Sequence, residues 1–410
     1  PMEFGFLYYE MNAPIEISTT GHMLIDAHNE NPVNDEKIKN VFLNSLMKYQ
    51  TNNPFRKNAN DNSPLVLLLQ VIKLLDDPDE NDAGIFRSEL SLIICWPNRD
   101  AQALYEKIKE LRKQYHFTYG DEVIYEICLK LLGATDKQKN RFKINQITGE
   151  AVDEFIRKMR ITGVVSLRGN GRFIDFNSFE MEKIEYILDG YIDYSNYSSK
   201  REFFDYMGSI DTKIVSLTQV VDDSVVSDVR INTLNHWATE YSKEDIANEL
   251  SILSKNGESK NAILRIIDKP TRLEFLTSIA LKQHFVDLDV RPNYHIDDEG
   301  LPTFTASGGV ADIECYDTDC NSLVEVTLMC ARNQATNEMP AITRHLQEAI
   351  EKEPNITQFS ILVAPSIHAD TKYMAGYSKY QYGINILTLT IAEFIEQICV
   401  NRRIVEMLPL

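Results

Sequence analysis

Two neighbouring strand-like segments in the second half of the chain each carry a carboxylate where an apolar side chain would be expected. Residues 307–316 predict a turn entering a strand that Asp312 opens, and Glu325 interrupts the apolar run 323–328. The polar stretch 317–322 predicts a turn, so that the two segments form a hairpin. Because an apolar strand face normally excludes a charged group, this pair constrains the fold more than any other feature of the sequence.

The hairpin can bring Asp312 and Glu325 side by side on adjacent strands. Two carboxylates at such a distance repel each other unless a divalent cation lies between them. Hard oxygen ligands suit Mg²⁺, which binds through one or two carboxylates and keeps several waters. The spacing follows the D…(D/E)-x-K pattern of nucleases, except that Thr327 occupies the position of the lysine. The alternative is that both carboxylates are structural and are paired in salt bridges.

Other side chains are candidates for the same site. Glu274 lies on a predicted helix, and Glu338 begins another. His345 follows Glu338 by seven residues, which places both on one helix face. Gln334 comes just before that helix. Glu274 alone would usually be a solvated helix residue, so its assignment depends on the resemblance described below.

The order of the predicted elements indicates an α/β second half and a mainly helical first half. After the hairpin, helices over 337–352 and 390–404 alternate with strands over 359–365 and 384–389. Helical patterns elsewhere cover 35–49, 64–76, 83–96, 100–115 and 231–253. We expect a multidomain chain with a recognition region over 1–185, a helical connector over 186–256 and a second functional domain over 257–410.

The charge of the chain is unevenly distributed. There are 42 Lys and Arg residues against 61 Asp and Glu, a formal net charge of -19, which argues against a nucleic-acid partner. Residues 137–172 are the exception, with nine basic and three acidic side chains. The nine are Lys137, Lys139, Arg141, Lys143, Arg157, Lys158, Arg160, Arg168 and Arg172. A solvated basic face is the ordinary interpretation of such a run.

The predicted local structure of this basic segment favours DNA binding. Residues 150–160 have the apolar spacing of a helix, and strands are predicted over 164–167 and 172–176. Gly169-Asn170-Gly171 supplies the positive φ that a tight hairpin turn requires. A helix followed by a hairpin with arginines at both turn flanks is typical of a winged-helix module, whose wing reaches phosphates while a helix enters the major groove.

Composition excludes several other classes of protein. A hydrophobic content of 43% and a charged content of 25% are ordinary for a soluble globular protein. The apolar runs are far shorter than the roughly 18 residues that a membrane span needs. The six cysteines form no CxxC pair and suggest no zinc site. We expect a cytoplasmic protein with reduced thiols and no membrane partner.

The sequence resembles the AlwI/MlyI/PleI/BstNBI family of type IIS restriction and strand-nicking endonucleases. The similarity runs through nearly the whole chain, and its pieces are weak singly but specific together. They are 1–18, Pro64-Leu65-Val66, Arg160-Ile161-Thr162-Gly163, Leu273-Glu274-Phe275-Leu276, 309–314, Val324-Glu325-Val326-Thr327, 334–338 and Thr343-Arg344-His345. The Glu-Val-Thr variant in place of the lysine motif is itself similar to that family.

The resemblance implies a winged-helix-rich recognition region and a PD-(D/E)XK nuclease core with a central mixed sheet. It implies that Asp312, Glu325, Glu338 and Glu274 are active-site acids, with His345 and Gln334 in support, and that Asp312, Glu325 and Glu274 hold Mg²⁺, for which Mn²⁺ can substitute. The expected activity is cleavage a few bases to one side of a short asymmetric duplex site. Expected partners are double-stranded DNA, a second copy or a small catalytic subunit for the other strand, and a cognate methyltransferase in a bacterial or archaeal cytoplasm.

Family members also carry residues before the position of Pro1, so we expect a partial product. Two other functions remain open on the sequence. One is a winged-helix DNA-binding regulator with a degenerate nuclease fold, and the other is a structure-specific repair nuclease. Retention of all four carboxylates argues against the regulator. The repair nuclease shares the chemistry, and only its lack of sequence specificity distinguishes it.

Overall fold

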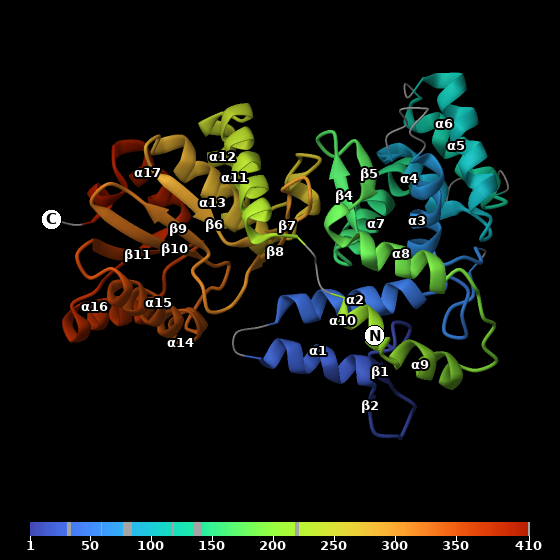
Figure 1. Ribbon diagram of the computed structural model, residues 1–410, viewed down its shortest axis with the longest axis horizontal. Coiled ribbons are helices and arrows are strands. Elements are labelled where there is room, and N and C mark those ends of the chain that lie inside the picture. Colours follow the sequence, from blue (N-terminus) through green and yellow to red (C-terminus); the bar gives the residue numbers. More distant parts are fainter. Residues whose placement is uncertain are drawn as a thin grey trace. The chain divides into compact units, whose positions relative to one another are not determined.

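The fold was analysed in a computed structural model that describes residues 1–30, 34–58, 60–76, 84–116, 119–134, 142–217 and 221–408 (Figure 1). The chain divides into two compact units. The first contains Pro1–Glu30 and Asn34–Val221, and the second contains Asp222–Leu410. The boundary falls inside the segment 186–256 that was expected to be a connector, and the three-part division stays a prediction.

The first unit is mainly helical. Some of its helices begin at polar caps, as in α2 (Asp35–Lys48), where the side chain of Asn34 accepts a hydrogen bond from the Lys37 amide. The other elements of this unit are β1 (Leu7–Tyr8), β2 (Glu16–Ile17), α1 (Thr19–Asn29), α3 (Pro64–Leu75), β3 (Ile85–Phe86), η1 (Arg87–Glu89), α4 (Leu90–Cys95), α5 (Ala101–Tyr115), α6 (Asp121–Leu131), η3 (Gln146–Glu150), α7 (Ala151–Arg160), β4 (Val165–Arg168), β5 (Phe173–Phe176), η4 (Ser178–Glu180), α8 (Met181–Gly190), α9 (Lys200–Gly208) and α10 (Thr212–Ser216).

The basic segment forms the helix and hairpin that the sequence predicts. Helix α7 buries Val152, Phe155, Ile156 and Met159 on one face, and β4 pairs with β5 in antiparallel register. Gly169, Asn170 and Gly171 at the turn all have positive φ. The short strand β3 adds to β5, which gives the antiparallel order β3-β5-β4. Helix α4 packs against α6 and α7 beside this sheet.

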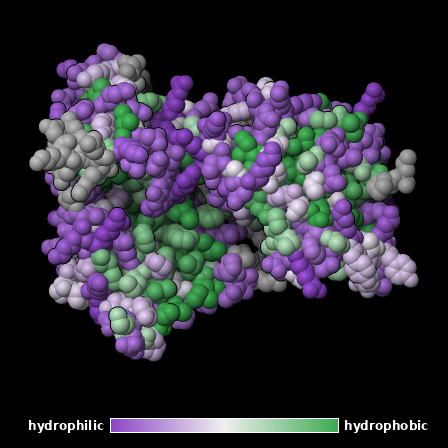
Figure 2. Space-filling view, turned by 180° about the vertical axis from the view of Figure 1, so that it is seen from behind, coloured by the Kyte–Doolittle hydropathy of each residue, from purple (hydrophilic) through white to green (hydrophobic). Residues whose placement is uncertain are grey.

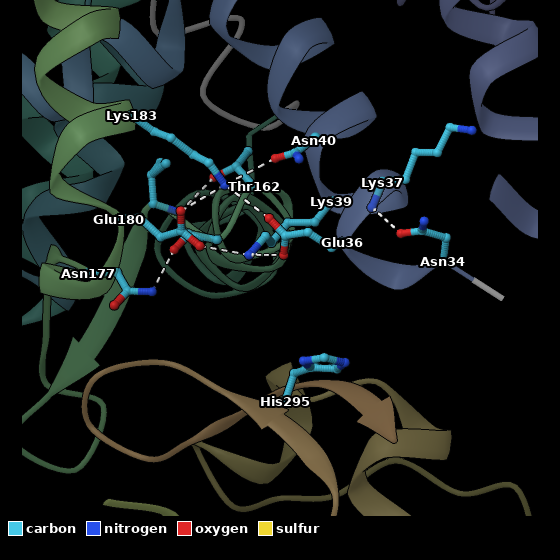
Figure 3. A network of polar contacts seen from close by, with 12 residues as sticks. Asn34, Glu36, Lys37, Lys39, Asn40, Thr162, Asn177, Glu180, Lys183 and His295 are labelled. Carbon is cyan, nitrogen blue, oxygen red and sulfur yellow. Dashed lines mark hydrogen bonds and ion pairs between the residues drawn. The ribbon is translucent and has the colours of Figure 1, made fainter. Parts of the chain in front are cut away.

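A buried ion-pair network joins α2 to η4 and α8 within the first unit (Figure 3). The ammonium of Lys183, which is only 1% exposed, lies 2.8 Å from Glu180, 3.1 Å from Glu36 and 3.1 Å from the Asn40 side chain. Lys39 bridges Glu180 at 2.7 Å and Glu36 at 2.6 Å. Buried charges persist in a fold only when they are paired in this way. The network therefore fixes two chain segments that are far apart in the sequence.

The second unit consists of a sheet with helices on both faces. Its elements are α11 (Asp223–Glu240), α12 (Lys243–Ser254), η5 (Leu264–Ile266), α13 (Lys269–His284), β6 (Asp289–Pro292), β7 (Tyr294–Ile296), β8 (Pro302–Ala306), β9 (Ile313–Tyr316), β10 (Cys320–Val326), α14 (Asn333–Asn337), α15 (Met339–Lys352), β11 (Thr357–Ala364), α16 (Ala369–Tyr382), β12 (Asn385–Thr390), α17 (Ile391–Val400) and η6 (Ile404–Met407).

The central sheet is mixed, with strand order β12-β11-β10-β9-β6. Strands β10, β11 and β12 are parallel to one another, whereas β9 is antiparallel to both β10 and β6. Parallel pairs need a crossover, which here is supplied by α15 and α16. Helices α14, α15 and α16 pack together on one side of the sheet, and α12, α13 and α17 pack together on the other (Figure 1). The chain is thus an α/β protein with a mixed central sheet.

Several sequence-based expectations for individual elements were wrong. The helix predicted over 83–96 is preceded by strand β3, because Ile85 and Phe86 pair with β5. The helix predicted over 231–253 is two helices, since Ser242 caps α12 in a capping box with Asp245. Strand β10 begins at Cys320, inside the predicted turn. Strands β6, β7 and β8 and helix α16 were not predicted.

The surface mixes polar and apolar groups. Apolar side chains gather in patches among polar ones on the face drawn in Figure 2. In the first unit the strongly exposed apolar side chains include Met11 and Ile15, at 83% and 62% exposure. Among the described residues, none of the helices combines the length and the apolar character that crossing a bilayer requires.

Candidate active site

Asp312 and Glu325 lie side by side at the junction of β9 and β10. The antiparallel register pairs Ile313 with Val324, so the next pair outward is Asp312 with Glu325. The Asp312 amide donates to Glu325 Oε2 at 3.4 Å, and the Val326 amide donates to Asp312 Oδ2 at 2.7 Å. The expected juxtaposition of the two carboxylates is confirmed. The hydrogen bond from the Val326 amide holds the Asp312 carboxylate at the end of β10.

Glu274 reaches the same region from helix α13. This helix begins at Asp268, whose side chain caps the Thr271 amide, and it is buried along most of its length. Glu274 is 3% exposed, and its Oε2 accepts a hydrogen bond from the Ala306 amide at 2.9 Å. Ala306 is the last residue of β8, a strand that was not predicted. A backbone donor from β8 therefore helps to hold a third carboxylate near the pair.

The pKa of Asp312 is raised by burial and by the neighbouring acids. The residue as a whole is partly exposed, but its carboxyl group is buried. Burial raises the pKa of Asp312 well above its ordinary value, and the negative charges of Glu274 and Glu325 raise it further. Burial and the charge of Glu325 also raise the pKa of Glu338. Strongly perturbed acids that cluster in this way are more common at functional sites than elsewhere.

The Glu338 carboxylate is hydrogen-bonded to Thr327, the residue at the position of the motif lysine. Glu338 lies at the junction of α14 and α15, and the Thr327 hydroxyl donates to its Oε1 at 2.9 Å. This hydrogen bond favours the ionised form of Glu338 and opposes the effect of burial on its pKa. Thr327 was recognised in the sequence only as a departure from the motif. Its contact with Glu338 could not be read from the spacing, because an irregular stretch and the short helix α14 separate the two residues.

His345 is paired with Glu325. Its Nδ1 lies 3.0 Å from Glu325 Oε1, and the residue is 9% exposed. Nε2 is buried without a hydrogen-bond partner among the described residues. His345 also lines a cavity of about 180 Å³ against β9, β10 and α15, together with Glu314 and Glu348. With Nδ1–H donating to Glu325, Nε2 is left as an acceptor.

Gln334 has a different set of contacts from the acids. It is fully buried, its Nε2 donates to the carbonyls of Met329 and Ser366, and its Oε1 accepts from the His368 amide and the Thr371 hydroxyl. These four hydrogen bonds use the capacity of the amide. Gln334 therefore ties the loop after β10 to the start of α16, and its expected catalytic support would act through that loop.

The donor set suits a hard divalent cation in its chemistry. Asp312, Glu325 and Glu274 offer carboxylate oxygens whose negative charges oppose one another, and a cation would relieve that repulsion. Among the described residues, three potential ligand atoms come within 4.8 Å of one another only at Asp317, Asp319 and Cys320. Arg403 already pairs with the two aspartates there. The three site acids thus do not close around one point, which is compatible with Mg²⁺ held by one or two carboxylates and water.

The described basic residues of 137–172 fall into two groups. Arg160 is 5% exposed inside the first unit, and Arg168 pairs with Asp175 at 3.0 Å. The exposed residues are Lys143, Arg157, Lys158 and Arg172. Lys137, Lys139 and Arg141 lie outside the described residues. The exposed group is carried by α7, the segment before it and the β4–β5 turn.

Comparison with known proteins identifies one family. The profile of the AlwI restriction endonuclease matches residues 2–229 and 207–397. No curated protein matches the chain. Among solved structures, the small subunit of the heterodimeric restriction endonuclease R.BspD6I is 24% identical with a TM-score of 0.32, covering 38% of this chain and 76% of its own.

Restriction endonuclease FokI is 11% identical with a TM-score of 0.30, covering 99% of this chain and 79% of its own. FokI bound to DNA is 11% identical with a TM-score of 0.28, covering 98% and 78%. At these TM-scores the likenesses add nothing to the fold described above. The profile match extends over both units, so the chain belongs to the AlwI restriction endonuclease family.

Proposed function

We propose that this chain is a type IIS restriction endonuclease, or a strand-nicking relative, that hydrolyses a phosphodiester bond with the help of Mg²⁺. The observation that carries the proposal is the position of Asp312. Its buried carboxyl group lies beside Glu325, and the charges of Glu274 and Glu338 also raise its pKa. A fold gains no stability from such a cluster of like charges. The cluster has a use if a cation and a phosphate bind there.

Each residue has a distinct part in the proposed reaction. Bound Mg²⁺ would supply Lewis-acid stabilisation of the phosphate and an activated water. Asp312 and Glu325 would hold the cation, with Glu274 as a further carboxylate on the side of α13. His345 would keep Glu325 in place through Nδ1. This core would be of the PD-(D/E)XK type, with Thr327 in the position of the lysine.

The first unit would recognise the duplex. Helix α7, the β4–β5 hairpin and the antiparallel order β3-β5-β4 support a winged-helix module in which the turn at 169–171 acts as the wing. The exposed Arg172 at the turn and Arg157 on α7 would contact phosphates. Cleavage to one side of an asymmetric site follows from placing recognition and catalysis in different units.

The described residues contain one set of these carboxylates. Cleavage of both strands would therefore need a second catalytic set, from a second copy of the chain or from a small catalytic subunit, while a single chain would nick one strand. A cognate methyltransferase would protect the site in the host. Mn²⁺ would replace Mg²⁺ at the same oxygens, since both cations accept carboxylate and water ligands.

Incubation of the purified protein with supercoiled plasmid and Mg²⁺ tests the proposal. Open-circular product is expected from a nickase and linear product from a double-strand cutter, with neither in EDTA or with Asp312→Asn. Asp287→Asn, an exposed carboxylate in the same unit, is the matched control and should cleave normally. Metal-independent DNA binding without cleavage would favour a regulator. Product ends at random positions would favour a repair nuclease, and cleavage by Asp312→Asn at the wild-type rate would refute the assigned site.

A further inference from the structure

Thr327 makes three hydrogen bonds that fix its orientation completely. Its amide donates to the Val363 carbonyl at 3.0 Å, which extends the pairing of β10 with β11. Its hydroxyl accepts from the Met329 amide at 3.0 Å and donates to Glu338 Oε1 at 2.9 Å. Because a hydroxyl has a single proton, the proton that goes to Glu338 is committed there as long as Met329 occupies the other side of the oxygen.

The loop from Thr327 to Glu338 is held in one conformation from both ends. Gln334 anchors its far end with four hydrogen bonds. Ala331, in the middle, has a φ of 62°, a left-handed conformation that is strained for a residue with a Cβ. A strained residue persists where its surroundings determine the backbone strongly. The loop therefore brings Glu338 to Thr327 as a fixed arrangement.

Glu338 has a carboxylate that no basic side chain neutralises by a contact that the structure shows. The partner of Oε1 is the neutral hydroxyl of Thr327, and the charges of Glu338 and Glu325 act on each other. A lysine in the position of Thr327 would instead add a positive charge to the site. The hydroxyl favours the ionised form of Glu338 against the effect of burial and fixes the direction of one carboxylate oxygen.

We propose that Thr327 is a positioning residue whose hydroxyl fixes the direction of the Glu338 carboxylate, so that a further negative charge acts on a divalent cation at the site, where the nuclease motif has a lysine at the position of Thr327. The inference rests on the proposed function for the identity of the site. It adds that the Thr327 hydroxyl influences cation binding through its hydrogen bond to Glu338.

Four variants separate this role from a merely structural one. Thr327→Val keeps the shape and loses the hydroxyl, Thr327→Ser keeps the hydroxyl, Glu338→Gln removes the charge, and the double variant combines Thr327→Val with Glu338→Gln. Thr336→Val removes an exposed hydroxyl from the same loop and is the matched control. Mn²⁺ affinity by calorimetry and the rate of plasmid nicking are measured for each, with thermal melts to verify folding.

Thr327→Val is expected to lower Mn²⁺ affinity and nicking rate by about 10- to 100-fold, as for other residues that orient a metal ligand. Thr327→Ser should restore most of the loss, and Thr336→Val should match wild type. In the Glu338→Gln background, Thr327→Val should cause no further loss, because two residues that act through one contact are not additive.

The outcomes distinguish this inference from the proposed function. If the wild type binds Mn²⁺ but does not nick, the proposed nuclease function is refuted. If Thr327→Val still lowers Mn²⁺ affinity, and does so non-additively with Glu338→Gln, the positioning role of Thr327 is supported. Normal nicking and affinity in Thr327→Val would refute the role of Thr327 and leave the nuclease intact. If the loss of affinity caused by Thr327→Val adds to the loss caused by Glu338→Gln, Thr327 acts independently of Glu338, and its positioning role is refuted. Absence of Mn²⁺ binding by wild type would overturn both.

Discussion

The Nδ1 atom of His345 lies 3.0 Å from Oε1 of Glu325, which joins α15 to β10 at the centre of the sheet. Glu325 is thereby fixed on one oxygen, while its other oxygen faces the Asp312 amide. The contact of the imidazole is thus with the Glu325 carboxylate. This relationship leads to the first prediction.

His345→Ala should lower the cleavage rate by about 10- to 100-fold, because Glu325 loses the group that orients it. Asparagine can place its amide nitrogen near the position of Nδ1, so His345→Asn should retain clearly more activity than His345→Ala. Plasmid nicking at saturating Mg²⁺ measures both. Equal loss in the two variants would show that the hydrogen bond to Glu325 is not what matters.

Asp312→Asn should stabilise the second unit in the absence of divalent cations while abolishing cleavage. Asparagine keeps an oxygen for the Val326 amide and removes a charge that Glu274 and Glu325 oppose. We expect a gain of about 1 kcal/mol, or roughly 2–4 °C in Tm for a unit of this size. Differential scanning calorimetry in EDTA provides the measurement.

The gain from Asp312→Asn should depend on pH in a defined direction. The pKa of Asp312 is raised in the folded state, so the ionised carboxylate destabilises the fold above that pKa. As the pH falls through the raised pKa the carboxyl group takes up a proton, and the difference between wild type and variant should shrink. A difference that grows on acidification would contradict the cause assigned to this shift.

Lys183→Met should destabilise the first unit by about 3 kcal/mol, because it leaves the buried Glu180 with one cation instead of two. Lys107→Met removes a more exposed lysine that pairs with Glu110 at 2.7 Å. That control should change the free energy of unfolding by less than about 0.5 kcal/mol. Urea unfolding of both variants tests the contrast.

The basic residues should differ in their effects on DNA binding. Arg172→Gln and Lys158→Gln remove exposed charges, and each should weaken binding to any duplex and lower the salt slope by about one. Arg160→Gln replaces a buried side chain and should lower the free energy of unfolding instead. Lys113→Gln, on α5, is the control outside the basic segment. Fluorescence anisotropy over a range of salt concentrations would reveal the slopes.

The features that the sequence predicts best are turns and hairpins that depend on residues close together in the chain. The turn 169–171 and the hairpin of Asp312 and Glu325 were predicted because glycine φ preferences and apolar alternation are local properties. Strand β3 was missed, since two residues carry too little pattern and it pairs with a strand almost ninety residues later. The β10-β11-β12 order also depends on long-range pairing.

In the candidate site, too, a shared helix face could be predicted, whereas the hydrogen bonds that Thr327 and Ala306 make to acids could not. Spacing places Glu338 and His345 on one helix face, and His345 does reach Glu325. The spacing does not reveal that Thr327 contacts Glu338, because the loop that joins them is irregular and includes the left-handed Ala331. The Ala306 amide on Glu274 comes from a strand that the sequence did not indicate.

The ion pairs of Lys39 and Lys183 also limit how the chain can be engineered. They connect α2 with the segment directly after the β4–β5 hairpin, and the aliphatic part of Lys39 lies over Gly163, where a Cβ would come within 2.7 Å of it. A hairpin grafted from a relative would pack against an α2 whose side chains do not make the corresponding contacts. Exchange of specificity between family members should therefore succeed only when α2 and the block from α7 to α8 are transferred together.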